Sequence, residues 1–339
     1  MSPGVIEQQF LYDEAPFPSC HAATIVQPRN RTLVAAFFGG TKEGHPDVCI
    51  YLCRLAAGTW SKPVAVADGV QDDGTRHPTW NPVLFQPRGG PLMLFYKVGP
   101  SPSKWWGMVK TSNDDGRTWS RAAPLPPGIL GPIKNKPVQL AGEGDRGGDI
   151  ISPTSVESPQ LGWRICFERS SDGGRSWSSS MFVEQGELKA IQPSVLIHSQ
   201  TKLQAMGRTK SGRMFETWSN DAGQTWTPAA LTQLPNCNSG TDAVTLADGR
   251  HVLAYNHSNV EKIRTPLNLA LSTDGREWQA AAVLEDEPTG QYSYPAVIQS
   301  ADGLIHVVYT WKRLKIRHAV VDPNRLALGP LAGAHASHP

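Results

Sequence analysis

Five residues whose side chains can take part in chemistry stand beside short apolar runs. Tyr294 and His21 begin two such runs, Arg208 and His257 follow the ends of two others, and Asp47 lies in a loop. An arginine can bind a carboxylate through charge-assisted hydrogen bonds. A tyrosine can attack a carbon atom, and an aspartate or a histidine can transfer a proton. Together these side chains suit a site that handles an acidic sugar, with Tyr294, Asp47, His21 and His257 as the catalytic candidates.

A repeated turn motif predicts the elements that position these side chains. The Asp-box pattern S-x-D-x-G-x-[ST]-W occurs three times, and a fourth copy is one residue short. Its aspartate can accept backbone N–H bonds in a tight turn, and its tryptophan can pack between neighbouring sheets. Successive tryptophans lie 49 to 59 residues apart, which suits one four-stranded propeller blade. The four copies are Ser112–Trp119, Ser170–Trp177, Ser219–Trp226 and Ser272–Trp278, and Cys53–Trp60 keeps only the final Gly-Thr-Trp.

A second repeat gives the number of blades. Six times a polar residue, often followed by proline, opens a short apolar run that suits the buried innermost strand of a blade. The chain is therefore predicted to be all-β, a single six-bladed β-propeller over residues 1–339. Residues 5–13 are expected to add the outer strand of the last blade, and 322–339 to form a tail. The six opening residues are His21, Asn81, Ser152, Gln192, Asp242 and Tyr294.

Polar residues at the strand ends are expected to share one face of the propeller. The first strand of a blade begins, and its second strand ends, on the same side, whereas the Asp-box turns join strands three and four on the opposite side. Lys134, Lys136, Lys312 and the turn 236–240 should also lie near this face. The predicted substrate-binding residues are Arg208, Gln192, Lys42, Lys97, Arg76, His77, Asn81, Trp105, Trp106, Asp242 and Tyr292.

Composition excludes several classes of protein. The 339 residues carry a net charge of +2, too little for nucleic acid or an anionic membrane as the main partner. No apolar run is long enough to span a membrane, and the N-terminus lacks the pattern of a secretory signal. The five scattered cysteines favour reduced thiols in a cytoplasmic protein. No cofactor is expected, and no metal either, because His45-Pro-Asp47 and Arg76-His77 do not have a recognised ligand spacing.

The repeats make the chain resemble the sialidase (neuraminidase) superfamily over essentially its whole length. The resemblance implies that Arg208 binds a carboxylate and that Tyr294 is the nucleophile, with Tyr292 as a rival. It also implies that Asp47 is the acid/base residue. Two positions depart from the family pattern. Gln192 stands where sialidases have the glutamate that assists the tyrosine, and His21 stands in place of their first arginine.

Three functions remain open at this point. The first is an exo-acting glycoside hydrolase that removes a terminal acidic sugar from a glycan, with Arg208, His21 and Lys97 around the carboxylate. The second is a polysaccharide lyase that cleaves a uronate-containing chain by β-elimination, for which His21 or His257 with Tyr294 and Arg208 supplies the base, the acid and the carboxylate partner. The third is a non-catalytic glycan-binding propeller with Trp80, Trp105 and Trp106 as stacking platforms.

Overall fold

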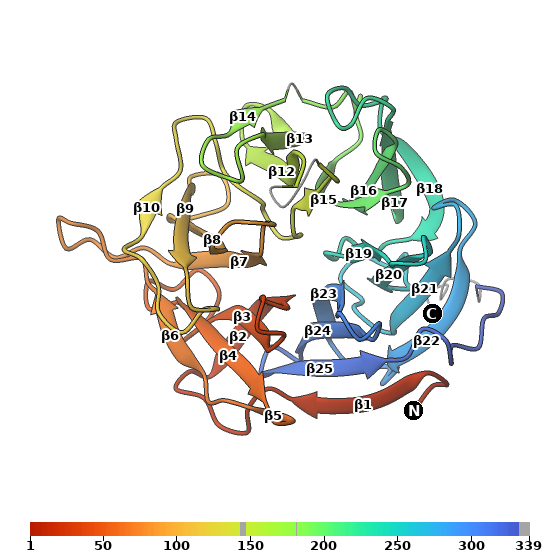
Figure 1. Cartoon of the computed structure of the whole chain (residues 1–339), viewed down its shortest axis with the longest axis horizontal. Coiled ribbons are helices and arrows are strands. Elements are labelled where there is room, and N and C mark those ends of the chain that lie inside the picture. Colours follow the sequence, from red (N-terminus) through yellow and green to blue (C-terminus); the bar gives the residue numbers. More distant parts are fainter. Residues whose placement is uncertain (143–146, 181, 332–339) are drawn as a thin grey trace.

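Six antiparallel sheets surround one axis. The computed structural model describes residues 1–142, 147–180 and 182–331, and within these residues it contains the six sheets seen in Figure 1. The predicted all-β, six-bladed propeller is therefore confirmed. Residues 332–339 of the predicted tail lie outside the described residues. Within the described residues, no helix is long and apolar enough to cross a membrane.

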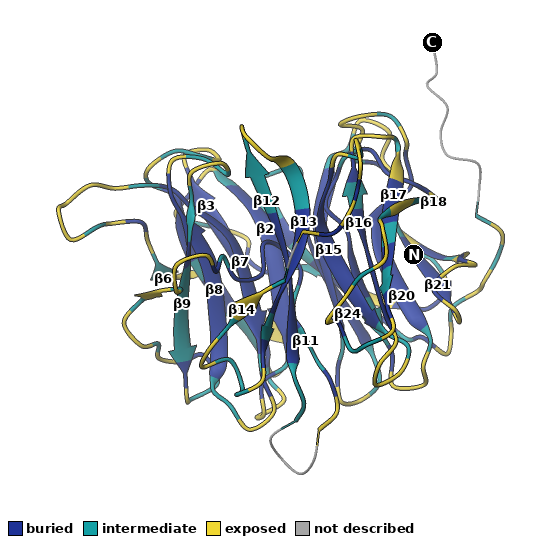
Figure 2. Ribbon diagram, turned by 90° about the horizontal axis from the view of Figure 1, so that it is seen from above, coloured by how far each residue is buried: buried dark blue, intermediate teal, exposed yellow. Residues whose placement is uncertain are grey.

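Each blade is built from strands that follow one another outward from the axis. The inner strands are buried almost throughout, and exposed residues concentrate in the loops at the two ends of the strands (Figure 2). The blades are β2 (Ser19–Val26), β3 (Leu33–Gly40), β4 (Cys49–Ala56) and β5 (Thr59–Trp60), with β6 (Val64–Ala67) also on β4; β7 (Thr79–Phe85), β8 (Leu92–Val98), β9 (Trp106–Ser112) and β10 (Ala123–Pro124); β11 (Val138–Gln139), β12 (Ile150–Ser158), β13 (Gly162–Ser170) and β14 (Ser178–Ser179); β15 (Ala190–Ile197), β16 (Leu203–Thr209), β17 (Arg213–Ser219) and β18 (Ala230–Pro235); β19 (Asp242–Thr245), β20 (His251–Asn256), β21 (Leu267–Ser272) and β22 (Gln279–Glu285); β23 (Tyr292–Gln299), β24 (Ile305–Trp311), β25 (Lys315–Val321) and β1 (Val5–Phe10).

The last blade combines the two ends of the chain. Strand β1 pairs antiparallel with β25, in a register that runs from Val5 opposite Val321 to Phe10 opposite Arg317. Figure 1 shows β1 as the outermost strand beside β25. The ring is thus closed by main-chain hydrogen bonds between segments that lie about 300 residues apart, and the edge of β25 is covered.

The repeated turns join the third and fourth strands of their blades. In the first of them, the Asp114 carboxylate accepts bonds from the hydroxyl of Thr118 at 2.6 Å and from its backbone N–H at 2.8 Å. These bonds lower the pKa of Asp114. The tryptophans pack across blades: Trp226 of blade 4 stacks on Phe167 of blade 3 with 3.9 Å between ring centroids, and Trp177 meets Phe95 edge-on. These turns tie neighbouring sheets together and take no part in the site described below.

One strand assignment made from the sequence is wrong. Ser152 does not open the innermost strand of blade 3, because β12, which contains it, is the second strand of that blade. The innermost strand is β11, which begins just after Lys136-Pro137 and contains only two residues. Its apolar run is too short to stand out, whereas Ile150–Ser158 forms nine residues of strand. The correction places the end of β12, and with it Glu157, at the face where second strands end.

Candidate active site

A backbone irregularity opens the inner strands of blades 1, 2, 4 and 6. At each of these places the register between the first and second strands shifts, and a non-glycine residue takes a positive φ. Such a backbone is uncommon for non-glycine residues and often occurs at functional sites. In three of these strands a proline follows, which has no N–H to donate to the ladder. The residues are Ala22 (φ 56°), Asn81 (φ 38°), Gln192 (φ 57°) and Tyr294 (φ 53°).

The Tyr294 hydroxyl is bonded to Arg208. One terminal nitrogen of the guanidinium donates to the phenolic oxygen at 2.6 Å and to Gln192 Oε1 at 3.2 Å, while Nε donates to Asn238 Oδ1 at 3.1 Å. The same guanidinium lies 5.1 Å from the ring centroid of Trp163. The predicted residues Arg208, Gln192 and Tyr294 are thus brought together. Among the described residues, no carboxylate lies within hydrogen-bond distance of the Tyr294 hydroxyl.

Two further arginines surround this tyrosine, and neither was predicted from the sequence. The Arg264 guanidinium lies 5.6 Å from the Tyr294 ring centroid, and one of its terminal nitrogens is enclosed without a hydrogen-bond acceptor among the described residues. Burial lowers the pKa of Arg264, and the charges of Arg313 and Arg208 act in the same direction. Arg313 pairs with Glu43 at 2.6 Å. An enclosed cation without a partner is costly, so an anionic ligand would find a favourable place here.

His21 packs directly against Tyr294. The two ring centroids lie 4.2 Å apart, and His21 Nδ1 lies 2.9 Å from Thr310 Oγ1. Burial lowers the pKa of His21 well below its ordinary value, and the positive charges of Arg313, Arg264, Lys134 and Arg208 add to this effect. The imidazole is therefore neutral at neutral pH.

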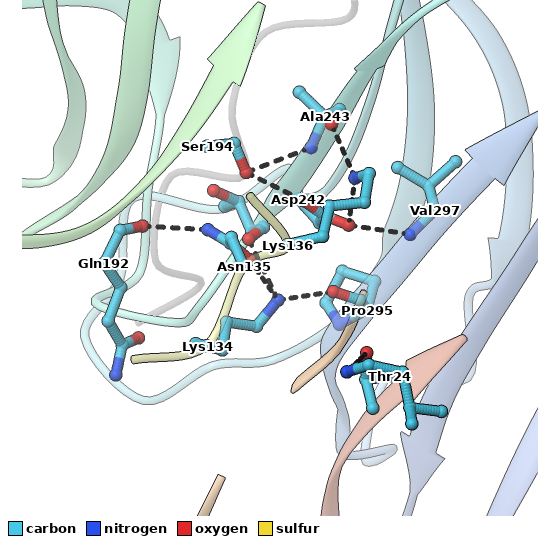
Figure 3. Close-up of polar contacts among 12 residues, drawn as sticks. Thr24, Lys134, Asn135, Lys136, Gln192, Ser194, Asp242, Ala243, Pro295 and Val297 are labelled. Atoms are coloured by element: carbon cyan, nitrogen blue, oxygen red, sulfur yellow. Dashed lines mark hydrogen bonds and ion pairs between the residues drawn. The ribbon is translucent and has the colours of Figure 1, made fainter. Parts of the chain in front are cut away.

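The loop between β10 and β11 runs into the centre of the ring below Tyr294, and we call residues 133–136 the axial plug (Figure 3). Lys134 Nζ donates to the carbonyls of Thr241 at 3.0 Å and Pro295 at 2.5 Å, as well as to Asn135 Oδ1 at 2.9 Å. It also lies 5.7 Å from the Tyr294 ring centroid. Burial lowers the pKa of Lys134 to about 7, against the opposing effect of Asp242.

Asp242 belongs to this plug rather than to the open face. Its carboxylate accepts from Lys136 Nζ at 2.9 Å, from the Ser194 hydroxyl at 2.9 Å and from the Val297 backbone at 2.8 Å. Asn135 Nδ2 donates to the backbone carbonyl of Gln192 at 3.0 Å. The plug of blade 3 is thereby bonded to blades 4, 5 and 6.

Lys97 holds the entrance of the same loop and does not join the Tyr294 cluster. Its fully buried ammonium group donates to the Pro132 carbonyl at 2.9 Å. Burial lowers the pKa of Lys97, while the charge of Glu168 opposes this. Glu168 in turn accepts from the Leu130 N–H at 2.6 Å. A residue at the end of a second strand can therefore point into the protein, as Lys97 does, as well as into the site.

Asp47 is held within its own loop. Its carboxylate accepts from the Thr41 hydroxyl at 2.6 Å and from the Thr41 N–H at 3.0 Å, and His45 Nδ1 lies 2.8 Å from it. Burial alone would raise the pKa of Asp47, but these contacts with Thr41 and His45 lower it. Lys42 of the same loop is exposed.

The remaining predicted residues lie in groups of their own. Arg76 donates to Cys49 Sγ at 3.2 Å, and the His77 ring meets Trp106 at 5.6 Å. Trp105 and Trp106 line a cavity of about 350 Å³ on blade 2, which is not lined by Tyr294. His257 Nδ1 lies 2.5 Å from the Tyr255 hydroxyl. Tyr292 donates to Glu287 Oε2 at 3.0 Å, and Lys312 pairs with the same oxygen at 2.6 Å.

Glu157 and Trp163 also lie at this face, and the sequence analysis missed both. They are directly opposite each other on β12 and β13. Trp163 stacks with Arg208, as described above, and with Lys210 at 4.4 Å. Once β12 is known to be a second strand, the rule that points to Arg208 also points to Glu157. The loops that carry Arg264 and Arg313 have no periodic pattern that could have indicated them.

Comparisons with known proteins agree with this architecture. The NanB sialidase of Streptococcus pneumoniae superposes with a TM-score of 0.73 at 12% identity, over 94% of this chain and 71% of that one. A protein of unknown function from Dyadobacter fermentans gives 0.74 at 17% identity, over 95% of this chain and 99% of that one. The α-L-arabinanase of Penicillium chrysogenum gives 0.67 at 15% identity, over 96% and 99%. No curated protein matches the chain in sequence.

At these identities the likeness to solved structures concerns the fold. The family assignment comes from a family model, which describes the BNR repeat-like domain and matches residues 31–307. The resemblance to sialidase-like repeat proteins that the sequence suggested is confirmed. Because this match covers well over half of the 339 residues, the chain belongs to the BNR repeat-like domain family.

Proposed function

We propose that this protein is a glycoside hydrolase that removes a terminal acidic sugar from a glycan. One observation carries the proposal: the Tyr294 hydroxyl is bonded to Arg208 at 2.6 Å inside a cluster of cations, and one enclosed nitrogen of Arg264 has no acceptor among the described residues. A carboxylate is an acceptor of the required charge and shape. The sialidases that share the fold are consistent with such a substrate.

In this mechanism the arginines bind the sugar and Tyr294 reacts with it. Arg264 and Arg313 bind the carboxylate, and Arg208 shares it while holding the phenolic oxygen. The phenolic proton passes to solvent water, and the charge-assisted bond from Arg208 stabilises the phenolate that remains. Tyr294 then attacks the anomeric carbon as the bond to the leaving glycan breaks. This is the tyrosine variant of the two-carboxylate scheme of glycosidases.

A second function, β-elimination on a uronate-containing glycan, is supported by His21. A neutral imidazole 4.2 Å from the Tyr294 ring could accept a proton, and the same arginines would neutralise the uronate carboxylate. This candidate needs no nucleophile, and so it does not depend on a base beside Tyr294.

Product analysis distinguishes the two functions. The enzyme is incubated with a panel of acidic oligosaccharides, and the products are examined for new reducing ends and for the ultraviolet absorbance of an unsaturated uronate. Hydrolysis predicts free acidic sugar without that absorbance, and a 2- or 3-fluoro sugar should trap a covalent adduct on Tyr294 that is visible by mass spectrometry. Unsaturated products and no adduct would replace the hydrolase by the lyase.

A further inference from the structure

Glu157 lies on the same line of contacts as the reactive tyrosine. It is half-buried near the end of β12, directly opposite Trp163, and its carboxylate accepts a hydrogen bond from that indole. The Trp163 ring carries the Arg208 guanidinium at 5.1 Å, and Arg208 donates to the Tyr294 hydroxyl at 2.6 Å. One indole and one guanidinium thus connect Glu157 with Tyr294.

The charges that act on Glu157 show that it faces the axis. They come from Arg208 and Lys210 of blade 4 and from Glu43 of the loop after β3 in blade 1. Glu43 is itself paired with Arg313 of blade 6. Because blades 1 and 3 are not neighbours in the ring, a carboxylate close to both Glu43 and Arg208 must lie above the centre of the site (Figure 1).

The environments of Glu157 and Asp47 differ in the direction that acid catalysis requires. Burial raises the pKa of Glu157, and Glu43 adds to this, against the opposing effects of Arg208, Lys210 and the Trp163 bond. The contacts of Asp47 with Thr41 and His45 lower its pKa instead. A general acid must carry its proton near the working pH, which favours a carboxyl group of raised pKa.

We propose that Glu157, rather than Asp47, is the general acid/base of the hydrolysis, an inference that rests on the proposed function. In the first step the Glu157 carboxyl group gives its proton to the glycosidic oxygen, while the bond from that oxygen to the anomeric carbon breaks and the bond to Tyr294 forms. In the second step the Glu157 carboxylate takes a proton from water, whose oxygen attacks the anomeric carbon and releases Tyr294.

Leaving-group dependence tests this role. The probes are the 4-nitrophenyl and methyl glycosides of N-acetylneuraminic acid and of glucuronic acid, and Glu157→Gln is compared with Asp47→Asn. Glutamine still accepts the bond from Trp163, and melting temperatures check the fold. Because 4-nitrophenolate departs without a proton, Glu157→Gln should lose less than about 10-fold on the nitrophenyl glycoside but roughly 100-fold or more on the methyl glycoside. Asp47→Asn should affect both substrates alike.

The wild-type enzyme supplies a second measurement. The pH profile of kcat/KM should fall on the basic side with the methyl glycoside, as Glu157 loses its proton, and should lack that fall with the nitrophenyl glycoside. Equal losses on both substrates, or no loss, in Glu157→Gln would refute the role of Glu157 in an active hydrolase. Leaving-group dependence in Asp47→Asn would assign the role to Asp47. A wild type that is inactive on both sugars would refute the hydrolase as well.

Discussion

The Tyr294 hydroxyl receives its hydrogen bond from a guanidinium, and this difference from the sialidase pattern begins at residue 192. Gln192 accepts from Arg208 at 3.2 Å through its amide oxygen, and an amide has no basic lone pair to take the phenolic proton. The positive φ of both Gln192 and Tyr294 brings the two side chains to the same arginine. At the scale of residues, the reactivity of the site therefore depends on Arg208.

Replacing Arg208 by alanine should reduce activity much more than stability. Loss of charge-assisted bonds to the substrate and to Tyr294 corresponds to about 1.5–3 kcal/mol, or roughly a 10- to 150-fold fall in kcat/KM. Arg276→Ala is the matched control, because that guanidinium also lies 5.1 Å from a tryptophan ring, Trp218. Kinetics and thermal melts are measured for both variants. A large drop in melting temperature with unchanged kcat/KM in Arg208→Ala would mark this arginine as structural.

Replacing Gln192 by glutamate should separate hydrolysis from elimination. In a hydrolase the new carboxylate can take the phenolic proton, so kcat should stay the same or rise. In a lyase the same charge beside the substrate carboxylate should depress activity, and His21→Ala should abolish it. Initial rates are measured with the substrate that the wild type prefers. A fall in kcat for Gln192→Glu together with an inactive His21→Ala would contradict the hydrolase.

The difference between Arg208 and Lys97 shows how far the sequence could predict individual site residues. Both are basic residues near the end of a second strand, yet one reaches Tyr294 and the other is buried against Pro132. Side-chain direction depends on the loop from another part of the chain that lies alongside, and this information is not local. Arg264 could not be predicted for the same reason, because its position near Tyr294 arises only when blades 5 and 6 pack together.

At the scale of elements, the axial plug links the site to the rest of the ring. Its residues come from the connection between blades 2 and 3, but they bond to backbone carbonyls of Gln192, Thr241 and Pro295. Pro295 directly follows the strained Tyr294. The plug therefore fixes the backbone that aims the tyrosine, and it does so from beneath, where it leaves the upper face open to substrate.

Replacing the two plug lysines by methionine should produce opposite patterns. Lys134→Met removes the donor to the Pro295 carbonyl, so kcat should fall while unfolding free energy drops by about 1–3 kcal/mol. Lys136→Met leaves the buried Asp242 carboxylate without its cation, which should cost about 3–5 kcal/mol of stability and reduce kcat less. Chemical denaturation and kcat are measured for both. An equal fall in kcat would show that the plug acts only through stability.

Elements were predictable where a local signal defines them. The turns were found because serine, aspartate, glycine and tryptophan bond within eight residues, as the contacts of Asp114 with Thr118 show. The inner strand of blade 3 was missed because β11 has only two residues and is held by the plug rather than by an apolar run of its own. The number of blades was nevertheless right, because the same blade contains the conspicuous turn Ser170–Trp177.

At the scale of the whole molecule, the closing seam between blades 6 and 1 contains a buried chain of histidines. Trp60 of blade 1 donates to His318 Nδ1 at 3.4 Å, and His318 Nε2 lies 2.9 Å from His306 Nδ1. His306 Nε2 in turn lies 2.9 Å from the Ser300 hydroxyl. His318 belongs to β25, the strand on which β1 closes the ring. Protonation of this chain would therefore act at the place where the two ends of the protein meet.

Acid should weaken the protein through His318. Burial lowers the pKa of His318 to about 3, and the charge of His306 adds to this, whereas the unfolded chain should titrate near 6.5. Below pH 6.5 the unfolded state binds the proton and the folded state does not, so stability is lost as the pH falls from about 6.5 towards 3. Between pH 7.5 and 5 this single group should contribute a loss of about 2 kcal/mol. Urea denaturation at both pH values compares the wild type with His318→Gln, which keeps an acceptor for Trp60 and cannot titrate. The variant should lose less stability on acidification by that amount, and the same pH dependence in both proteins would show that the His318 imidazole does not govern the seam.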